Sequence, residues 1–442
     1  MVYFAGRLVR GGWLPWMLAV AGLLATAGLW AGVAVEQLPA AAALGAVIFY
    51  MDGTALVLSG LAIGLGFLAA LYSGPALPRA EKYYALVLAL TGTIVGLVST
   101  TDLFSLWLWF EAMTISTIFL VAFHREEGLA LEAGFKYLVQ SAGGSGFIVL
   151  GIALTLAQLG DLALSQPASL TPALLFVVGF GVKAALVPLH TWLPDAHAQA
   201  PSPISALLSG VVIEAALIAL IKALGGAQLD LLLVFAVLNM VAGNLLALQQ
   251  TNIKRMLAYS SLVHVGYILM ALGLGTAAGL QAGLFHMVTH GLMKGAAFLA
   301  AGVFLHALCA PGQPLSRREL VGAGRHLPLP AFVLALALLS LGGLPPLAGF
   351  MSKWQVFAAA AQSGFTLLVI VAALNSVLSL GYYGPVVLAL YRAPVSVEQP
   401  HDAPARWERI PLVAAAAAIV IVGIVPVSLL IEPIILALGG LP

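Results

Sequence analysis

The stretch GVKAALVPLHTWLPDAHAQAPSP, residues 181–203, places Lys183 at the end of an apolar run and two prolines, Pro188 and Pro194, directly after it. A proline inside a helix removes a hydrogen bond and clashes with the preceding turn. The stretch therefore predicts an apolar helix that is broken near residues 183–195.

A second stretch of the same kind, LSLGGLPPLAGFMSKWQVF at 339–357, predicts another broken helix near residues 342–353, just before Lys353. The residues that break it are Gly342, Gly343, Pro345 and Pro346. Paired broken segments at matching places in two halves are typical of transporters with inverted repeats. We predict two inverted five-helix repeats, each with a broken helix as its fourth member.

The composition assigns both breaks to a membrane protein. Of the 442 residues, 62% are hydrophobic and only 8% are charged, against about 25% charged residues in an ordinary globular chain. So few charges could not cover the surface of a soluble protein of this size. The net charge of +1 argues against a nucleic-acid partner, and the single cysteine, Cys309, excludes an internal disulfide and a multi-thiolate metal site.

Apolar runs long enough to span a membrane predict an all-α polytopic protein of about thirteen transmembrane helices. The runs are 13–35, 47–73, 83–101, 103–123, 135–160, 172–189, 203–224, 229–250, 257–275, 277–308, 328–350, 364–391 and 411–438. We divide the chain into N-terminal helices (1–78), a first five-helix half (79–224), a second five-helix half (225–391), and a cytoplasmic loop with the C-terminal helix (392–442).

The distribution of lysine and arginine predicts the orientation. With the N-terminus inside, 14 of the 18 basic residues fall on the inside, while the outside loops carry Asp161 and Asp230 and no basic residue. Cytoplasmic loops are enriched in basic residues. We expect a bacterial or archaeal cytoplasmic membrane, with the N-terminus cytoplasmic and the C-terminus outside.

The other titratable residues within apolar segments predict an ion pathway, because charges at membrane depth face the bundle interior or a water-filled cavity. They are Glu111, Lys183, Glu214, Lys222, His264, His286, His290, Lys294 and Lys353. Simpler interpretations stay open. The glutamates and lysines could form structural ion pairs, Lys222 could reach the outer surface from its helix end, and His264 could be a hydrogen-bonded core histidine.

The spacing of His286, His290 and Lys294, at i, i+4 and i+8, places them on one face of a helix. Two histidines at i and i+4 can bind zinc. Here the next group on that face is a cationic lysine and no carboxylate accompanies them. A proton relay is the better prediction, and we expect no metal site.

Several motifs together resemble one family. Besides the two broken stretches, they are WFEAMTIS at 109–116, NIKRMLAYSSLVHVGY at 252–267 and LFHMVTHGLMKGAAFLAAG at 284–302. They resemble the proton-translocating antiporter-like subunits of respiratory complex I, with relatives in Mrp-type cation/proton antiporters and membrane-bound hydrogenases. The resemblance covers residues 47 to 391.

The resemblance implies a role for each relay residue. Glu111 matches the glutamate that pairs with the lysine of the first broken helix, and Lys183 matches that lysine. His286, His290 and Lys294 match the polar helix between the half-channels, and Lys353 matches the lysine near the outside exit. Glu214 departs from the pattern, because the family more often has a lysine there. Either Glu214 pairs with Lys183 or Lys294 in a rewired relay, or pumping is impaired.

We therefore expect a proton-translocating, non-redox subunit of a redox-driven complex, without a cofactor in this chain, since it has no P-loop or dinucleotide fingerprint. The expected partners are other membrane subunits, peripheral redox subunits, lipid, and protons or Na⁺. One alternative is a subunit of an Mrp-type cation/proton antiporter, and another is a non-pumping scaffold paralogue. NSVLSLGYY at 375–383 favours the complex I class, whereas HGLMKGAAFLAAG at 290–302 favours the Mrp and hydrogenase branches.

Overall fold

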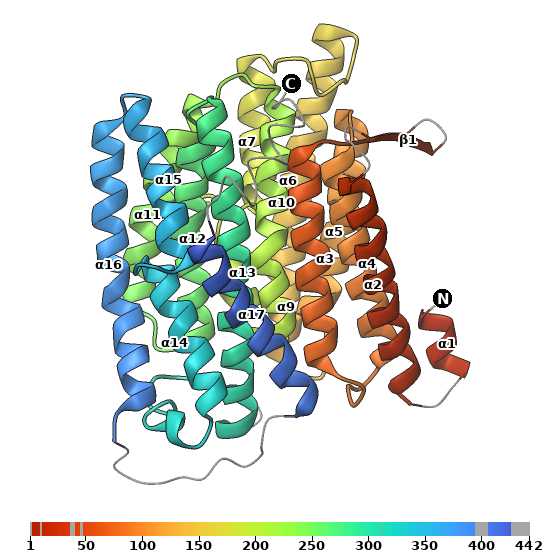
Figure 1. Cartoon of the computed structure of the whole chain (residues 1–442). Coiled ribbons are helices and arrows are strands. Elements are labelled where there is room, and N and C mark those ends of the chain that lie inside the picture. Colours follow the sequence, from red (N-terminus) through yellow and green to blue (C-terminus); the bar gives the residue numbers. More distant parts are fainter. Residues whose placement is uncertain are drawn as a thin grey trace.

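The computed structural model describes residues 2–8, 11–35, 40–44, 47–310, 312–393 and 405–425. In this part the chain forms a bundle of long helices that run roughly side by side (Figure 1). The helices of the first part are α1 (Val2–Leu8), α2 (Trp13–Val35), α3 (Gly53–Ser73), α4 (Ala80–Ser99), α5 (Leu103–Val121), α6 (Gly128–Leu159), α7 (Leu170–Lys183), α8 (Leu193–Gln199), α9 (Ser202–Leu207), the π-helix η1 (Leu208–Val212) and α10 (Ile213–Leu224).

The second part continues the same bundle. Its helices are α11 (Asp230–Leu248), α12 (Ile253–Leu272), α13 (Ala277–Leu308), the 3₁₀ turn η2 (Ala323–Arg325), α14 (Pro328–Gly342), α15 (Ala348–Gln362), α16 (Thr366–Tyr391) and α17 (Arg406–Ile424). Helix α13 lies at the centre, where it packs against α3, α9, α12, α14, α15 and α17. Helix α17 crosses the bundle obliquely (Figure 1).

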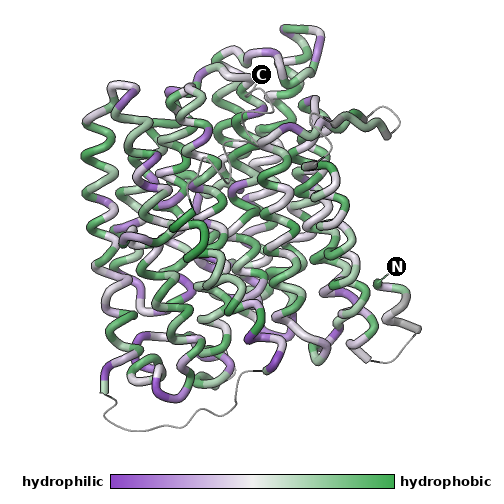
Figure 2. Tube along the Cα trace, viewed as in Figure 1, coloured by the Kyte–Doolittle hydropathy of each residue, from purple (hydrophilic) through white to green (hydrophobic). Residues whose placement is uncertain are grey.

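The surface of the bundle is that of an integral membrane protein. Among the described residues, eleven helices are long and apolar enough to cross a membrane, and α7 and α14 are shorter apolar helices. Large apolar side chains face outward, such as Leu367 (75% exposed) and Leu388 (71%). Hydrophobic residues run along the helices, and hydrophilic residues gather at the two ends of the bundle (Figure 2). The number of thirteen spans and the inverted repeats stay predictions.

One predicted segment begins differently. Residues 47–51 of the expected span 47–73 form a strand, β2 (Val47–Met51), which pairs antiparallel with β1 (Ala40–Leu44). The run VIFYM is rich in β-branched and aromatic residues, which favour strands. Helix α3 begins after Asp52, whose carboxylate accepts a hydrogen bond from the Ala55 amide at 2.7 Å, as an N-cap does.

Part of the predicted C-terminal helix cannot be compared. Residues 411–424 of the span 411–438 belong to α17. Residues 426–438 and the C-terminal residue, whose side of the membrane was predicted, lie outside the described residues. The proposed four-part division of the chain stays a prediction.

The first break separates α7 from α8, and side chains bind its free backbone groups. Asn239 of α11 donates to the Ala185 carbonyl (3.1 Å) and accepts from the Val187 amide (2.9 Å). The indole of Trp192 donates to the carbonyl of Val182 at 2.6 Å. These bonds make non-helical backbone tolerable inside a bundle, because buried polar groups need partners.

The second half-helix of this break is held by charges. Asp195 of α8 forms ion pairs with Lys136 of α6, at 3.0 Å, and with Arg255 of α12. Lys254, the neighbour of Arg255, donates to the carbonyl of Ala200, which ends α8. The short helix is therefore tied to α6 and α12 at its polar end.

The second break separates α14 from α15. Gly343 has φ +87°, a conformation that glycine adopts without steric strain. The carbonyls of Leu341 and Gly342 accept hydrogen bonds from Lys353 Nζ (2.8 Å) and Ser376 Oγ (3.3 Å). Here a predicted relay lysine itself binds the free end of the broken helix.

Two glycines allow η1 and α13 to approach each other closely. A Cβ on Gly291 would lie 2.6 Å from the carbonyl oxygen of Gly210, and a Cβ on Gly210 would lie 3.1 Å from the carbonyl oxygen of Gly291. The π-turn η1 ends directly before α10. This contact brings the start of α10 against the middle of α13.

Candidate functional site

Lys183 lies in the last turn of α7 with only 1% of its surface exposed. Its Nζ lies 3.4 Å from Thr117 Oγ1 and above the rings of Tyr137, 4.5 Å from the centroid, and Phe110, 5.6 Å away. Aromatic faces and a helix C-terminus both attract a cation. This pocket can therefore hold a charged lysine without a carboxylate in contact.

Glu111 of α5 lies close enough to Lys183 for an electrostatic interaction. Among the described residues no ion pair of 4.0 Å or less joins the two. The Oε1 atom of Glu111 is buried and has no hydrogen-bond partner in that part of the chain. The carboxylate thus interacts with Lys183 across a gap rather than through the direct contact that the sequence suggested.

Glu214 and His290 form the central contact. Glu214 lies in the first turn of α10. Its Oε1 atom is hydrogen-bonded to His290 Nδ1 of α13, at a distance of 2.8 Å. Both side chains are fully buried. The expectation that Glu214 pairs with Lys183 or Lys294 was wrong about the partner, because the close approach of η1 to α13 places His290 against the carboxylate.

Three histidines continue from this contact. The ring of His264 on α12 stacks on His290, with centroids 4.9 Å apart, and on His286, 5.2 Å apart. His264 Nδ1 lies 3.0 Å from His286 Nε2, and His286 Nδ1 lies 3.0 Å from Ser352 Oγ. The last two contacts place a ring nitrogen against another polar atom, as proton transfer through imidazoles requires. His290 and His264 only stack, and His290 Nε2 has no hydrogen-bond partner among the described residues.

Two buried lysines lie near the histidines. Lys294 follows His290 by one turn of α13, and Lys353 follows Ser352 on α15. Lys294 is fully buried and donates to Ser260 Oγ and to the carbonyl of Leu257, at 2.7 Å. Lys353, on α15 next to Ser352, also donates to Ser376 Oγ at 2.9 Å. Neither lysine has an ion-pair partner within the described ranges. A structural ion pair therefore does not explain either of them.

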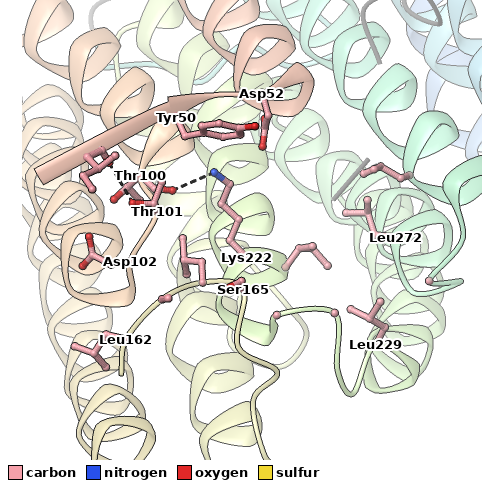
Figure 3. A pocket seen from close by; sticks show the side chains of 18 of the residues that line it. Tyr50, Asp52, Thr100, Thr101, Asp102, Leu162, Ser165, Lys222, Leu229 and Leu272 are labelled. Atoms are coloured by element: carbon pink, nitrogen blue, oxygen red, sulfur yellow. Dashed lines mark hydrogen bonds between the residues drawn. The ribbon is translucent and has the colours of Figure 1, made fainter. Parts of the chain in front are cut away.

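Lys222 serves a different purpose. It donates to the carbonyls of Val98 and, at 3.4 Å, of Thr100, which end α4. Its side chain lines a cavity of about 1040 Å³ beneath the β-hairpin. In Figure 3 it points toward Thr100, with Tyr50 and Asp52 beyond its Nζ. Lys222 therefore binds the carbonyl groups at the end of α4, and it makes no hydrogen bond to the histidines.

Sequence reasoning missed several residues that contact the predicted ones. His264 is a buried, hydrogen-bonded histidine, as one interpretation of the sequence expected, and its partner is His286. Ser260 and Ser352 carry no spacing signal, because their partners lie on other helices. His197 of α8 is also buried and stacks on Phe298 at 4.8 Å. The signal that could have singled it out is its place directly after a helix break.

A metal centre is not indicated. Among the described residues, no group of three or more His, Cys, Asp or Glu side chains could hold a metal ion. His264, His286 and His290 are stacked face to face, whereas ligands of one ion converge on a point. The cluster suits proton transfer between rings better.

The fold defines an integral membrane protein of long apolar helices with a buried cluster of titratable groups in its interior. Residues 100–379 match the family described as NADH:quinone oxidoreductase/Mrp antiporter, transmembrane. The chain belongs to this family, and it is an antiporter-like membrane subunit of the complex I type.

Three relatives illustrate the similarity. The chain is 38% identical to NADH-quinone oxidoreductase subunit N of Syntrophotalea carbinolica, over 73% of this chain and 72% of the relative. It is 34% identical to F420H2 dehydrogenase subunit N of Methanosarcina mazei, over 78% and 75%. Its structure superposes with a TM-score of 0.86 on a chain of respiratory complex I from Thermus thermophilus, solved with bound aureothin, at 30% identity over 99% and 97% of the two chains.

These relatives are named as subunits or parts of multisubunit complexes. The resemblance drawn from the motifs is confirmed.

Proposed function

We propose that this chain moves protons across a bacterial or archaeal cytoplasmic membrane as a subunit of a redox-driven complex. The observation that supports this most is the buried series of side chains from Glu214 through His290, His264 and His286 to Ser352, which is joined by hydrogen bonds except at the stacked rings of His290 and His264. Two of the relatives are named as subunits of a dehydrogenase and an oxidoreductase, which favours a redox-driven complex over a cation/proton antiporter.

The first half of the pathway loads a proton. Lys183 accepts it from the cytoplasmic side, and the nearby charge of Glu111 favours the protonated amine. A change in the position of Glu111 then releases the proton toward Glu214. No direct hydrogen bond joins Lys183 to Glu214 in the described part of the chain, so this step uses water or a side-chain movement.

The second half passes the proton outward. His290 takes it from Glu214 on Nδ1 and releases one from Nε2, which has no hydrogen-bond partner among the described residues, so a water carries the proton to His264. His264 and His286 then relay it toward Ser352 and Lys353. An imidazole can accept a proton on one nitrogen and release one from the other. Lys353 then releases the proton to the outside.

The side chains favour protons over Na⁺. The network consists mainly of imidazoles and amines, and Na⁺ is a hard cation that prefers oxygen ligands, like Ca²⁺ and Mg²⁺. Amines and imidazoles bind protons instead. We therefore propose H⁺ as the transported ion.

The energy must come from elsewhere. Moving one charge outward against 100 mV requires about 2.3 kcal/mol, and the sequence offers no nucleotide or cofactor motif to supply it. Peripheral redox subunits are the proposed source, with the cofactors held there and lipid around the membrane subunits.

For the orientation we propose, from the distribution of basic residues, that the N-terminus is cytoplasmic and the C-terminus outside.

Purification in mild detergent with mass spectrometry of all stoichiometric partners tests the class of complex. Iron–sulfur or flavin subunits support the redox-driven proposal. Membrane subunits alone, together with sodium-dependent proton flux, would overturn it in favour of the antiporter.

Substitution of Lys183 tests the relay. We expect Lys183→Met to assemble normally but to abolish proton pumping. Lys222→Met is the matched control, because Lys222 is also a largely buried lysine of a membrane helix but binds only main-chain carbonyls. Equal pumping by the two variants would refute the role of Lys183.

A further inference from the structure

Helix α6 contacts the segment that follows the first break through three successive pairs of side chains. The pairs are Gln140 with Thr191, hydrogen-bonded at 2.9 Å, Tyr137 with Trp192, stacked on each other, and Lys136 with Asp195, an ion pair of 3.0 Å. The order of the partners shows that the two segments run antiparallel. Tyr137 and Trp192 form the middle pair and are both fully buried, so this pair connects the exposed contacts to the interior of the bundle.

The stack of Tyr137 and Trp192 is close and nearly parallel. The ring centroids lie 4.0 Å apart, with an angle of 13° between the ring planes. Trp192 stands directly before α8, and its indole donates its hydrogen bond to the carbonyl of Val182, the residue before Lys183. Trp192 therefore joins the start of α8 to the end of α7, and it fixes the place of the Tyr137 ring against the last turn of α7.

The other contacts of Tyr137 are with Lys183 and its hydrogen-bond acceptor. Lys183 Nζ lies 4.5 Å from the centroid of the tyrosine ring. The Tyr137 hydroxyl lies 3.1 Å from Thr117 Oγ1, and the same threonine oxygen lies 3.4 Å from Lys183 Nζ. Tyr137 thus contacts the lysine with its ring face, and its hydroxyl contacts the side chain that accepts from the lysine.

Two glycines allow the ring to come this close. Gly144 lies two turns after Tyr137 on α6, and Gly179 lies one turn before Lys183 on α7. A Cβ on Gly179 would lie 2.8 Å from the carbonyl oxygen of Gly144. Membrane helices approach each other this closely where small residues stand at the contact. The glycines therefore set the short distance between α6 and α7 that brings Tyr137 to Lys183.

No carboxylate holds Lys183 in direct contact. Among the described residues no ion pair of 4.0 Å or less joins it to Glu111. A buried ammonium needs a partner, because its transfer out of water is costly. The face of an aromatic ring is negative, and it attracts a cation most strongly where water is excluded. The ring of Tyr137 and the oxygen of Thr117 are therefore the groups that stabilise a protonated Lys183.

We propose that the Tyr137–Trp192 stack positions and stabilises the Lys183 ammonium while the proton is loaded. Tyr137 supplies the negative ring face, and Trp192 holds that ring in place from the segment after the break. Both are positioning residues: neither ring accepts or donates the transported proton, which stays on Lys183 Nζ until the lysine passes it on. The proposal rests on the proposed function, because it needs Lys183 to carry a proton.

Proton pumping by the intact complex, with position 137 varied, tests the contact with the cation. Tyr137→Phe keeps the ring and should pump at the wild-type rate, whereas Tyr137→Leu removes the ring face and should pump at least about tenfold more slowly. Increasingly fluorinated phenylalanines at this position withdraw negative charge from the ring face and change its size little. Pumping should therefore fall stepwise along that series.

The same fluorinated series at Phe176 is the matched control. Phe176 is a fully buried ring of α7 with no cation over it among the described residues, so its series should stay level. A level series at position 137 would overturn the proposal, and so would equal losses at both positions, because packing alone would then explain them. The amount of assembled complex checks folding in every variant.

Substitution of Trp192 tests the stack. Trp192→Phe keeps an aromatic ring on Tyr137 but loses the indole donor, whereas Trp192→Leu loses both. The carbonyl of Val182 also accepts from the Ala185 amide at 3.2 Å, so loss of the indole donor leaves it with a partner. We expect Trp192→Phe to keep most of the pumping rate and Trp192→Leu to lose it, and equal rates in the two variants would overturn the role of the stack.

Lys183→Met separates the two levels of the account. Normal pumping by this variant would reject the proposed function itself. Loss of pumping in Lys183→Met together with a level fluorinated series at position 137 would overturn only the role of the stack.

Discussion

Replacing Glu214 with glutamine removes the titratable carboxyl group at the centre of the proposed relay and leaves the shape of the side chain nearly unchanged. Glutamine can still accept a hydrogen bond from His290, but it cannot take up or release a proton at neutral pH. We therefore expect Glu214→Gln to assemble and to lose proton pumping.

The size of the effect follows from the contact. At 2.8 Å the carboxyl group of Glu214 and His290 Nδ1 are close enough to exchange a proton directly. Loss of a general acid or base slows proton transfer about 10²–10⁴-fold, so pumping should fall at least about a hundredfold.

The assay is proton uptake by proteoliposomes that contain the purified complex, with electron transfer followed at the same time. Glu214→Asp shortens the side chain by one methylene and lengthens the contact to His290, so it should restore part of the activity through a bridging water. Glu319→Gln, in the loop before α14, is the control for loss of a carboxylate. Wild-type pumping by Glu214→Gln would refute the reasoning.

Three further predictions concern the frame around the relay. Asn239→Leu leaves two backbone groups of the first break unpaired, so it should lower the free energy of unfolding by about 2–5 kcal/mol, seen as a lower melting temperature in detergent. Gly291→Ala should cost about 1–3 kcal/mol through overpacking against Gly210, whereas Gly143→Ala, which faces open space, should not destabilise; equal melting temperatures would contradict this. Burial, and secondarily the charge of Glu319, raises the pKa of the Cys309 thiol to about 11, so maleimide labelling at pH 8 should be roughly two orders of magnitude slower than for a free cysteine.

The sequence predicted the positions of the breaks well, because prolines and glycines act locally. Lys183 precedes the first break and Lys353 follows the second break in the sequence itself, so their positions relative to the breaks could be predicted directly. The β-hairpin before Asp52 was not predicted, because the apolar run VIFYM continues into an apolar helix and composition alone does not separate the two.

Contacts between helices could not be predicted in the same way. The partner of Glu214 depends on how closely α13 approaches η1, which the glycines Gly210 and Gly291 decide only once both helices are placed. For the same reason the partners of His264, which lacks a histidine or lysine four residues away, could not be predicted. Its ring stacks on His286 and His290 of another helix, α13.

The number of protons moved per electron pair tests the central claim most directly. It is measured in proteoliposomes for the wild-type complex and for Lys353→Met, with the rate of electron transfer as the reference. If protons pass through this chain, the ratio falls in the variant while electron transfer continues. An unchanged ratio in a fully assembled Lys353→Met complex would contradict the account.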